Sequence, residues 1–246
     1  MQHRLKKIKK SFFIILVVLI VLSGGSAIYL GNYYHSVDVE KYMNGSSEVS
    51  VEKFDKGWFF DGAGEEKALI FYPGAKVATE AYAPLMYQLA ESGIDCFLVD
   101  MPFHMAFFGM NRAEKIMQEY NYEAWYLGGH SLGGAMAANF AADYVEDHTD
   151  GIRGLLLLAA YPTKDLSTSD MSVVTVYGSE DGVLNMDKIV AGRELMPQDY
   201  KEVCIEGGNH AQFGSYGAQK GDGTAAIPAE EQWARTVEVF VGDESE

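Results

Sequence analysis

Short apolar runs alternate with helical patterns along the chain from Glu48 onward. Several runs are apolar at consecutive positions, which is typical of strands buried on both faces of a parallel sheet. Such strands are predicted in the segments 67–74, 94–102, 124–129, 152–162, 171–179 and 200–210. The preceding segment EVSVEKFDKGWFFDG alternates apolar and polar positions around a polar centre, and it predicts a β-hairpin that turns near residues 55–57.

Helical patterns separate the predicted strands. They cover about residues 79–92, 111–120, 131–146, 185–196 and 229–240. Strands that alternate with helices of this length predict an α/β fold with a mainly parallel central sheet and right-handed crossovers. The connection YPTKDLSTSD, residues 161–170, is too short for a sizeable cap domain. We therefore expect a site at this edge of the sheet to be open to solvent or to large substrates.

The N-terminal region has a different pattern. Residues 1–10 carry five basic side chains, and residues 11–37 contain no Asp, Glu, Lys or Arg. This apolar length is sufficient to span a bilayer, and the basic cluster should remain in the cytoplasm. We expect a cytoplasmic segment (1–10), a transmembrane signal-anchor (11–31), a linker (32–47) and one extracytoplasmic α/β domain (48–246). A cleaved signal peptide is the alternative, because the most apolar run is short and residues 25–27 are small.

The net charge of the chain excludes some classes of binding partner. Without the five basic residues of the N-terminal segment, 14 Lys and Arg face 35 Asp and Glu, a formal charge of −21. Such a surface repels nucleic acid and anionic lipid, and no basic or aromatic stripe favours nucleic-acid binding. The sequence carries no signal for an oligomeric state.

Cysteines and histidines do not form a ligand pattern. Cys96 and Cys204 both lie in apolar, strand-like runs, where we expect reduced, buried thiols, although an exported domain could form a disulfide. The histidines at 104, 130, 148 and 210 are scattered without metal-ligand spacing. We expect no metal and no cofactor.

The heptad GGHSLGG is the first candidate for chemistry. Gly129, Ser131 and Gly133 match Gly-x-Ser-x-Gly, a pattern too short to be specific alone. A predicted strand precedes it and an alanine-rich predicted helix follows it, which is the context of a nucleophile elbow. The alternative is a glycine-rich turn before an ordinary helix.

A serine hydroxyl needs a base, and candidate partners follow later in the chain. The strand 171–179 is followed by Glu180 and Asp181, and the strand 200–210 ends at His210. The order Ser, acid, His, each at a strand end, is that of an activated serine, with Asp181 favoured as the acid. The alternatives are a surface histidine and turn carboxylates.

These motifs resemble those of the α/β-hydrolases. The resemblance rests on GHSLGG, GSEDGV and GGNHAQF and covers the chain from Glu48, and it is closest to small cap-less bacterial members with an N-terminal membrane anchor. It implies a carboxylesterase-type serine hydrolase with the triad Ser131, Asp181 and His210, acting on a small-molecule or lipid-like acyl ester. An acyltransferase with the same triad and a non-catalytic binding protein with this fold are the alternatives.

The resemblance also implies an oxyanion hole formed by the backbone N–H groups of Leu132 and Ala75. Many relatives have His-Gly-x in the second loop, whereas this chain has Pro73-Gly74-Ala75-Lys76. Replacing His by Pro does not remove the Ala75 amide. Lys76 could meet an acidic group of the substrate or be a solvated lysine.

The loop MPFHMAFFGMN is the candidate pocket wall, because it follows a predicted strand at the same sheet edge. Its apolar residues suit an acyl or aromatic substrate, and packing into the core would give the same pattern. The candidate pocket residues here are Met101, Phe103, Phe107 and Phe108, with Lys76 beside them.

Overall fold

A computed structural model describes residues 31–148 and 151–243. The chain divides into two units, Met1–Tyr33 and Tyr34–Glu246, and the account below concerns the second. The predicted signal-anchor, 11–31, lies outside the described residues except for Gly31. Among the helices of residues 31–148 and 151–243, none is both long enough and apolar enough to cross a bilayer.

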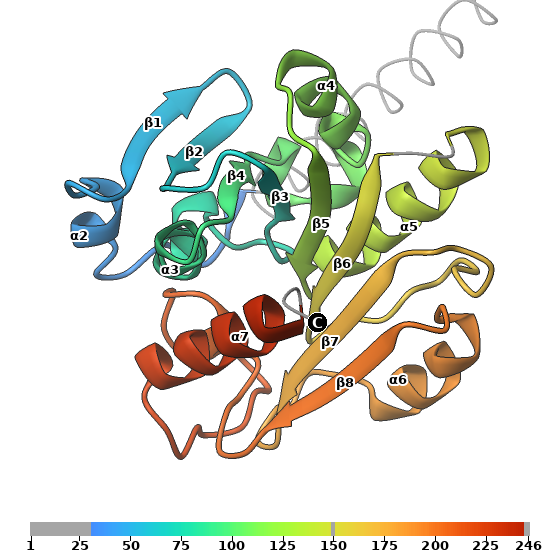
Figure 1. The fold of residues 1–246 in the computed structure, drawn as a ribbon. Helices are drawn as coiled ribbons and strands as arrows, with labels where there is room; N and C mark the ends of the chain where they lie inside the picture. The colour runs from blue at the N-terminus through green and yellow to red at the C-terminus, as the bar shows by residue number, and fades with distance from the viewer. Residues whose placement is uncertain (1–30, 149–150, 244–246) are drawn as a thin grey trace, which may run out of the picture. The chain divides into compact units, whose positions relative to one another are not determined.

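One eight-stranded sheet organises this unit, in the order β1-β2-β4-β3-β5-β6-β7-β8 (Figure 1). The hairpin β1–β2 is antiparallel and pairs antiparallel with β4, while all pairs from β4 to β8 are parallel. The bounds are β1 Ser50–Phe54, β2 Gly57–Asp61, β3 Lys67–Tyr72, β4 Asp95–Val99, β5 Ala124–His130, β6 Ile152–Leu158, β7 Ser172–Gly178 and β8 Tyr200–Ile205. The predicted hairpin and all six predicted strands are confirmed.

Helices cover both faces of the sheet, with α3 and α7 on one face and α4, α5 and α6 on the other (Figure 1). Alternate residues of β3 enter two separate apolar cores: Leu69 and Phe71 pack toward α3 and α7, whereas Ile70 and Tyr72 pack toward α4 and α5. The helices are α2 Glu40–Met43, α3 Ala83–Glu91, α4 Arg112–Glu119, α5 Leu132–Asp147, α6 Met186–Gly192 and α7 Ala229–Asp243, with short 3₁₀ turns η1 Thr79–Tyr82, η2 Pro102–His104, η3 Ala106–Phe108, η4 Arg193–Leu195 and η5 Ala211–Phe213.

Two predicted helices are shorter than expected. The pattern 79–92 divides into η1 and α3, with Pro84 in the first turn of α3, where its missing N–H costs little. The pattern 185–196 forms α6 and then tightens into η4. The connection between β6 and β7, residues 159–171, contains no helix or strand.

The segment expected to be a linker, 32–47, packs closely with the domain from Tyr34 onward. It forms the short helix α2, and Val39 and Tyr42 are buried in the core shared by α3 and α7. The two cysteines also differ from one another. Both are free thiols, but Cys204 is exposed on the edge strand β8, so the expectation of two buried thiols is wrong for Cys204.

Candidate active site

Ser131 occupies the turn between β5 and α5. His130 is the last residue of the strand and Leu132 is the first of the helix, so Ser131 alone makes the reversal. Its backbone has φ 53° and ψ −122°, a conformation that costs a non-glycine residue on the order of 1–3 kcal/mol and that clusters at functional sites. The N–H of Ser131 donates to Leu158 O at 2.9 Å, which ties the turn to the end of β6.

The glycines around Ser131 permit a close approach of the backbones. A Cβ on Gly129 would lie 2.6 Å from the backbone of Gly133 and Gly134, and a Cβ on Gly133 would lie 2.1 Å from Tyr72 O. No side chain fits at either distance. The alternative of an ordinary glycine-rich turn does not explain the strained serine between these two contacts.

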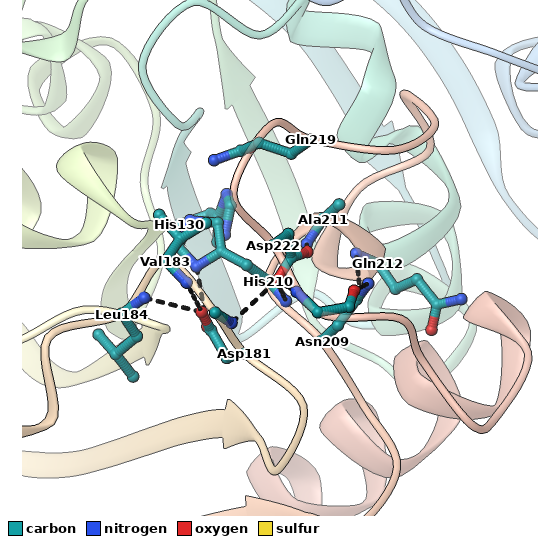
Figure 2. Close-up of polar contacts among 12 residues, drawn as sticks. His130, Asp181, Val183, Leu184, Asn209, His210, Ala211, Gln212, Gln219 and Asp222 are labelled. Carbon is teal, nitrogen blue, oxygen red and sulfur yellow. Dashed lines mark hydrogen bonds and ion pairs between the residues drawn. The ribbon is translucent and has the colours of Figure 1, made fainter.

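Asp181 and His210 form a buried pair at the ends of β7 and β8 (Figure 2). His210 Nδ1 and Asp181 Oδ2 are 2.8 Å apart, and each side chain is 2% exposed. The other carboxylate oxygen of Asp181 accepts from the N–H groups of Val183 at 2.9 Å and Leu184 at 2.7 Å. Glu180, the alternative acid, is exposed and contacts Ser179 Oγ at 3.3 Å. Asp181 is therefore the carboxylate that contacts His210.

A second carboxylate, Asp222, lies next to His210 and was missed in the sequence analysis (Figure 2). Asp222 Oδ1 accepts from the N–H groups of His210 at 3.2 Å and Gly182 at 3.1 Å, and Asp222 Oδ2 accepts from Ala211 at 2.8 Å. It thus joins the loop after β7 to the loop after β8. The only signal in the sequence is an aspartate between two glycines, Gly221 and Gly223, which is common in turns.

Asn209 is fixed just ahead of the histidine. Gln232 of α7, which is fully buried, accepts from Asn209 N–H through Oε1 at 3.0 Å and donates to Asn209 O through Nε2 at 2.8 Å. The side chain of Asn209 donates to Gly223 O and accepts from Gln212 N–H. The backbone that carries His210 is therefore held from both sides.

A buried network also surrounds His130, the residue before Ser131. The Tyr82 hydroxyl accepts from Gly74 N–H at 3.0 Å and forms a second hydrogen bond with His130 Nδ1 at 2.7 Å. The rings of His130 and His210 have centroids 4.4 Å apart. Burial, and then the neighbouring His210, hold the pKa of His130 well below its ordinary value. His130 is therefore neutral, and it links the serine turn to the loop after β3.

The predicted oxyanion donors lie on the two sides of this network. Leu132 is the first residue of α5, where a helix N–H has no acceptor within its own helix. Ala75 is half-buried, one residue after Gly74. Its neighbour Lys76 has φ 58°, donates its N–H to His104 O at 2.8 Å, and accepts from Tyr34 N–H at 2.7 Å. The loop after β3 is thus fixed by the N-terminal segment and by the loop after β4.

The loop after β4, 101–111, divides its apolar residues between interior and surface. Met101 is buried with α4 and α5 in the core, whereas Phe103, Phe107 and Phe108 are 59%, 68% and 56% exposed. Phe103 and His104 have φ values of 56° and 53°. The core-packing interpretation holds for Met101 and fails for the three phenylalanines. Within the described part of the chain, no group of three or more His, Cys, Asp and Glu side chains is placed to hold a metal ion.

Comparisons with known proteins agree with this architecture. The sequence pattern of the Alpha/beta hydrolase family matches residues 68–234. Among solved structures, carboxyl esterase 2 from the mycorrhizal fungus Tuber melanosporum is similar at TM-score 0.59 and 13% identity, covering 85% of this chain and 89% of that one. A thermostable esterase from Pseudomonas putida ECU1011 matches at TM-score 0.56 and 16% identity, covering 83% and 85%. The esterase domain of a Rhodothermus marinus protein matches at TM-score 0.56 and 13% identity, covering 79% and 97%.

Among curated proteins, no sequence matches this chain. The solved structures share so little sequence identity that they establish the fold alone. The family pattern, in contrast, spans more than half of the chain and includes Ser131, Asp181 and His210. The chain therefore belongs to the α/β-hydrolase family.

Proposed function

We propose that the protein is a serine hydrolase that cleaves carboxylic esters through an acyl-enzyme on Ser131. One observation carries the proposal: a buried Asp181–His210 pair at 2.8 Å lies at the same sheet edge as a serine held in a strained turn. For the fold alone, a glycine in the turn and an apolar pair in place of Asp181 and His210 would be more stable than the strained serine and the buried polar pair. They are expected where a side chain must be presented for chemistry.

The proposed reaction follows from the hydrogen bonds. Because His210 Nδ1 donates to Asp181, its Nε2 is the basic nitrogen, and it takes the Ser131 hydroxyl proton as Oγ attacks the ester carbonyl carbon. The oxyanion that forms accepts hydrogen bonds from the backbone N–H groups of Leu132 and Ala75. As the intermediate collapses, the ester C–O bond breaks and His210 protonates the departing alcohol. Water, deprotonated by His210, then releases the acid and restores Ser131.

The cellular setting in the proposal is a single-pass membrane protein with an extracytoplasmic catalytic domain. It rests on the basic residues of 1–10 and the uncharged segment that follows them. Protease added to intact cells should digest the domain. Digestion that requires lysis would contradict this topology.

A fluorophosphonate probe tests the nucleophile directly. Labelling of the wild-type chain that is lost in Ser131→Ala supports an activated serine. Ser172→Ala is a matched control, because Ser172 lies in β7, on another strand of the same sheet. Absence of labelling in a well-folded wild-type chain would exclude the hydrolase proposal and favour a non-catalytic binding protein.

Chromogenic esters of graded acyl length then define the substrate class. Each ester should be measured with and without a competing alcohol or amine. If the acyl group appears mainly on the added acceptor even at low acceptor concentration, acyl transfer replaces hydrolysis as the assigned reaction.

A further inference from the structure

We propose that the loop carrying Phe103, Phe107 and Phe108 inserts into the lipid surface of the membrane to which the chain is tethered, so that the active site takes acyl esters from that surface. The inference rests on the proposed function: its first half on the single-pass anchor, and its second half on the serine hydrolase. The three residues are called the aromatic cluster below.

The aromatic cluster is one contiguous surface. Phe108 packs edge-to-face against Phe103 and Phe107, with ring centroids 5.8 Å and 5.5 Å apart. Its members are the three most exposed large hydrophobic side chains of the described residues. Burying such rings stabilises a fold, yet Phe103 is exposed and has a φ of 56°, which is unfavourable for a bulky residue. Exposed apolar patches of this kind mark interaction sites.

The position of the cluster relative to the chain points to a membrane as the partner. The backbone of Tyr34 is fixed to the loop after β3 by Tyr34 N–H to Lys76 O at 2.7 Å and by Ala78 N–H to Tyr34 O at 2.8 Å. Lys76 in turn donates to His104 O at 2.8 Å, and His104 follows Phe103. Two hydrogen bonds thus connect the fixed end of the N-terminal segment with the aromatic cluster.

The length of the tether limits how far this edge can move from a membrane. The predicted signal-anchor ends at residue 31, three positions before Tyr34. Three residues span at most about 11 Å when fully extended. With 11–31 as the bilayer span, this reach keeps Tyr34 close to the interfacial region, where exposed aromatic rings are favoured.

Local charge also suits a membrane surface. The described domain belongs to an acidic chain, but Arg112 and Lys115 line the same surface hollow as Phe107 and Phe108. Glu114, the acidic residue between them, accepts from Gln118 one turn further along α4. Basic side chains around apolar ones favour anionic lipid surfaces. The cluster is therefore a place where the general repulsion between this acidic domain and anionic lipid is locally reversed.

Depth-dependent quenching tests the contact. The full-length chain carrying Phe107→Trp is reconstituted in vesicles of phosphatidylcholine and phosphatidylglycerol whose acyl chains are brominated. The parent chain in the same vesicles supplies the signal of the native tryptophans for subtraction. Val190→Trp is the matched control, because Val190 is 52% exposed on α6, at the β8 end of the sheet.

We expect brominated lipid to remove about half or more of the added fluorescence in Phe107→Trp and little of it in Val190→Trp, as for a shallowly inserted ring. Absence of quenching in Phe107→Trp, or equal quenching in both variants, overturns the proposal. The measurement is repeated in a Ser131→Ala background, so its result does not depend on catalysis. Failure of fluorophosphonate labelling would remove the hydrolase proposal and leave this measurement unaffected.

A charge reversal tests the supply of substrate from the surface. In anionic vesicles that contain a long-chain ester, Lys115→Glu should lower turnover about fivefold or more, the scale of one basic residue near such a surface. Its turnover of a soluble short-chain ester should match the wild type. Lys188→Glu is the control, an equal charge change on exposed α6. Equal losses in both variants, or no loss in Lys115→Glu, would overturn this part.

Discussion

The two halves of the candidate site are built in different ways. In the acid–base half, the side chains of Asp181 and His210 are buried, and the carboxylates of Asp181 and Asp222 accept backbone N–H groups. The aromatic half, the loop 101–111, keeps Met101 and Ala106 in the core and presents three phenylalanines to the surface. One half therefore fixes atoms for chemistry, while the other is suited to contact with something outside the chain.

The largest expected effect is on the acid of the first half. Asp181→Asn keeps the size of the side chain. The amide does not hold His210 in the tautomer that leaves Nε2 free as the base, and it does not stabilise the imidazolium ion. We expect kcat to fall about 10⁴-fold, as for loss of the orienting aspartate in such sites. Glu180→Gln is the control, since this neighbouring carboxylate does not contact His210. Equal activity of the two variants would show that Asp181 only supports the turn.

Within the aromatic half, a buried residue and an exposed residue should contribute very differently to stability. Met101→Ala removes a buried side chain and should lower the free energy of unfolding by about 2–5 kcal/mol. Phe107→Ser changes a mostly exposed ring and should alter it by no more than about 0.5 kcal/mol. Urea unfolding of both variants measures the difference. A large loss in Phe107→Ser would mean that the ring is needed by the fold.

The third prediction concerns the link between two loops of the acid–base half. Asp222→Asn places an amide NH₂ where a carboxylate oxygen now accepts, so one backbone N–H loses its acceptor. We expect a loss of about 1–3 kcal/mol in the free energy of unfolding. Activity should fall by less than in Asp181→Asn, because Asp222 contacts the His210 backbone and not its ring. Asp170→Asn, on an exposed loop residue, is the control.

The smallest expected effect is a change in the pH dependence of stability. The pKa of His130 is held far below its ordinary value in the folded chain, so below about pH 6.5 the unfolded chain binds a proton that the folded chain does not. The contribution of His130 to the free energy of unfolding is therefore fully present above about pH 6.5. It is lost as the pH falls below that value, by up to about 1.4 kcal/mol per pH unit. His130→Asn should have a flatter profile of melting temperature between pH 7 and 5. An unchanged slope would mean that His130 is not the group responsible.

Much of the fold could be predicted because parallel strands buried on both faces are apolar without interruption. Ser131 and His210 could be proposed as site residues for a related reason: the sequence pattern shows where each strand ends, so it predicts which residues gather at one edge of the sheet. Asp181 could be preferred but not separated from Glu180, since a one-residue shift in a turn reverses which carboxylate points inward. The geometry decides it through the bond to His210.

Other features depend on contacts between segments distant in the sequence. Asp222 is an ordinary turn aspartate until the loop after β8 brings it against His210. The exposure of Phe103, Phe107 and Phe108 could not be distinguished from burial, because apolar residues in an irregular loop have no periodicity. The attachment of residues 34–47 was missed for the same reason, since its core contacts have no periodicity: Val39 and Tyr42 are buried, and Tyr34 and Met43 pack partly buried against the core.

That attachment decides where a truncated, water-soluble form of the protein should begin. Starting at Glu48, as the strand pattern suggests, would remove two core side chains and both hydrogen bonds by which Tyr34 fixes the loop of Ala75. A form that begins at Tyr34 keeps all of them. The longer form should be the one that crystallises and turns over substrate, while the shorter one should lose activity before it loses its fold.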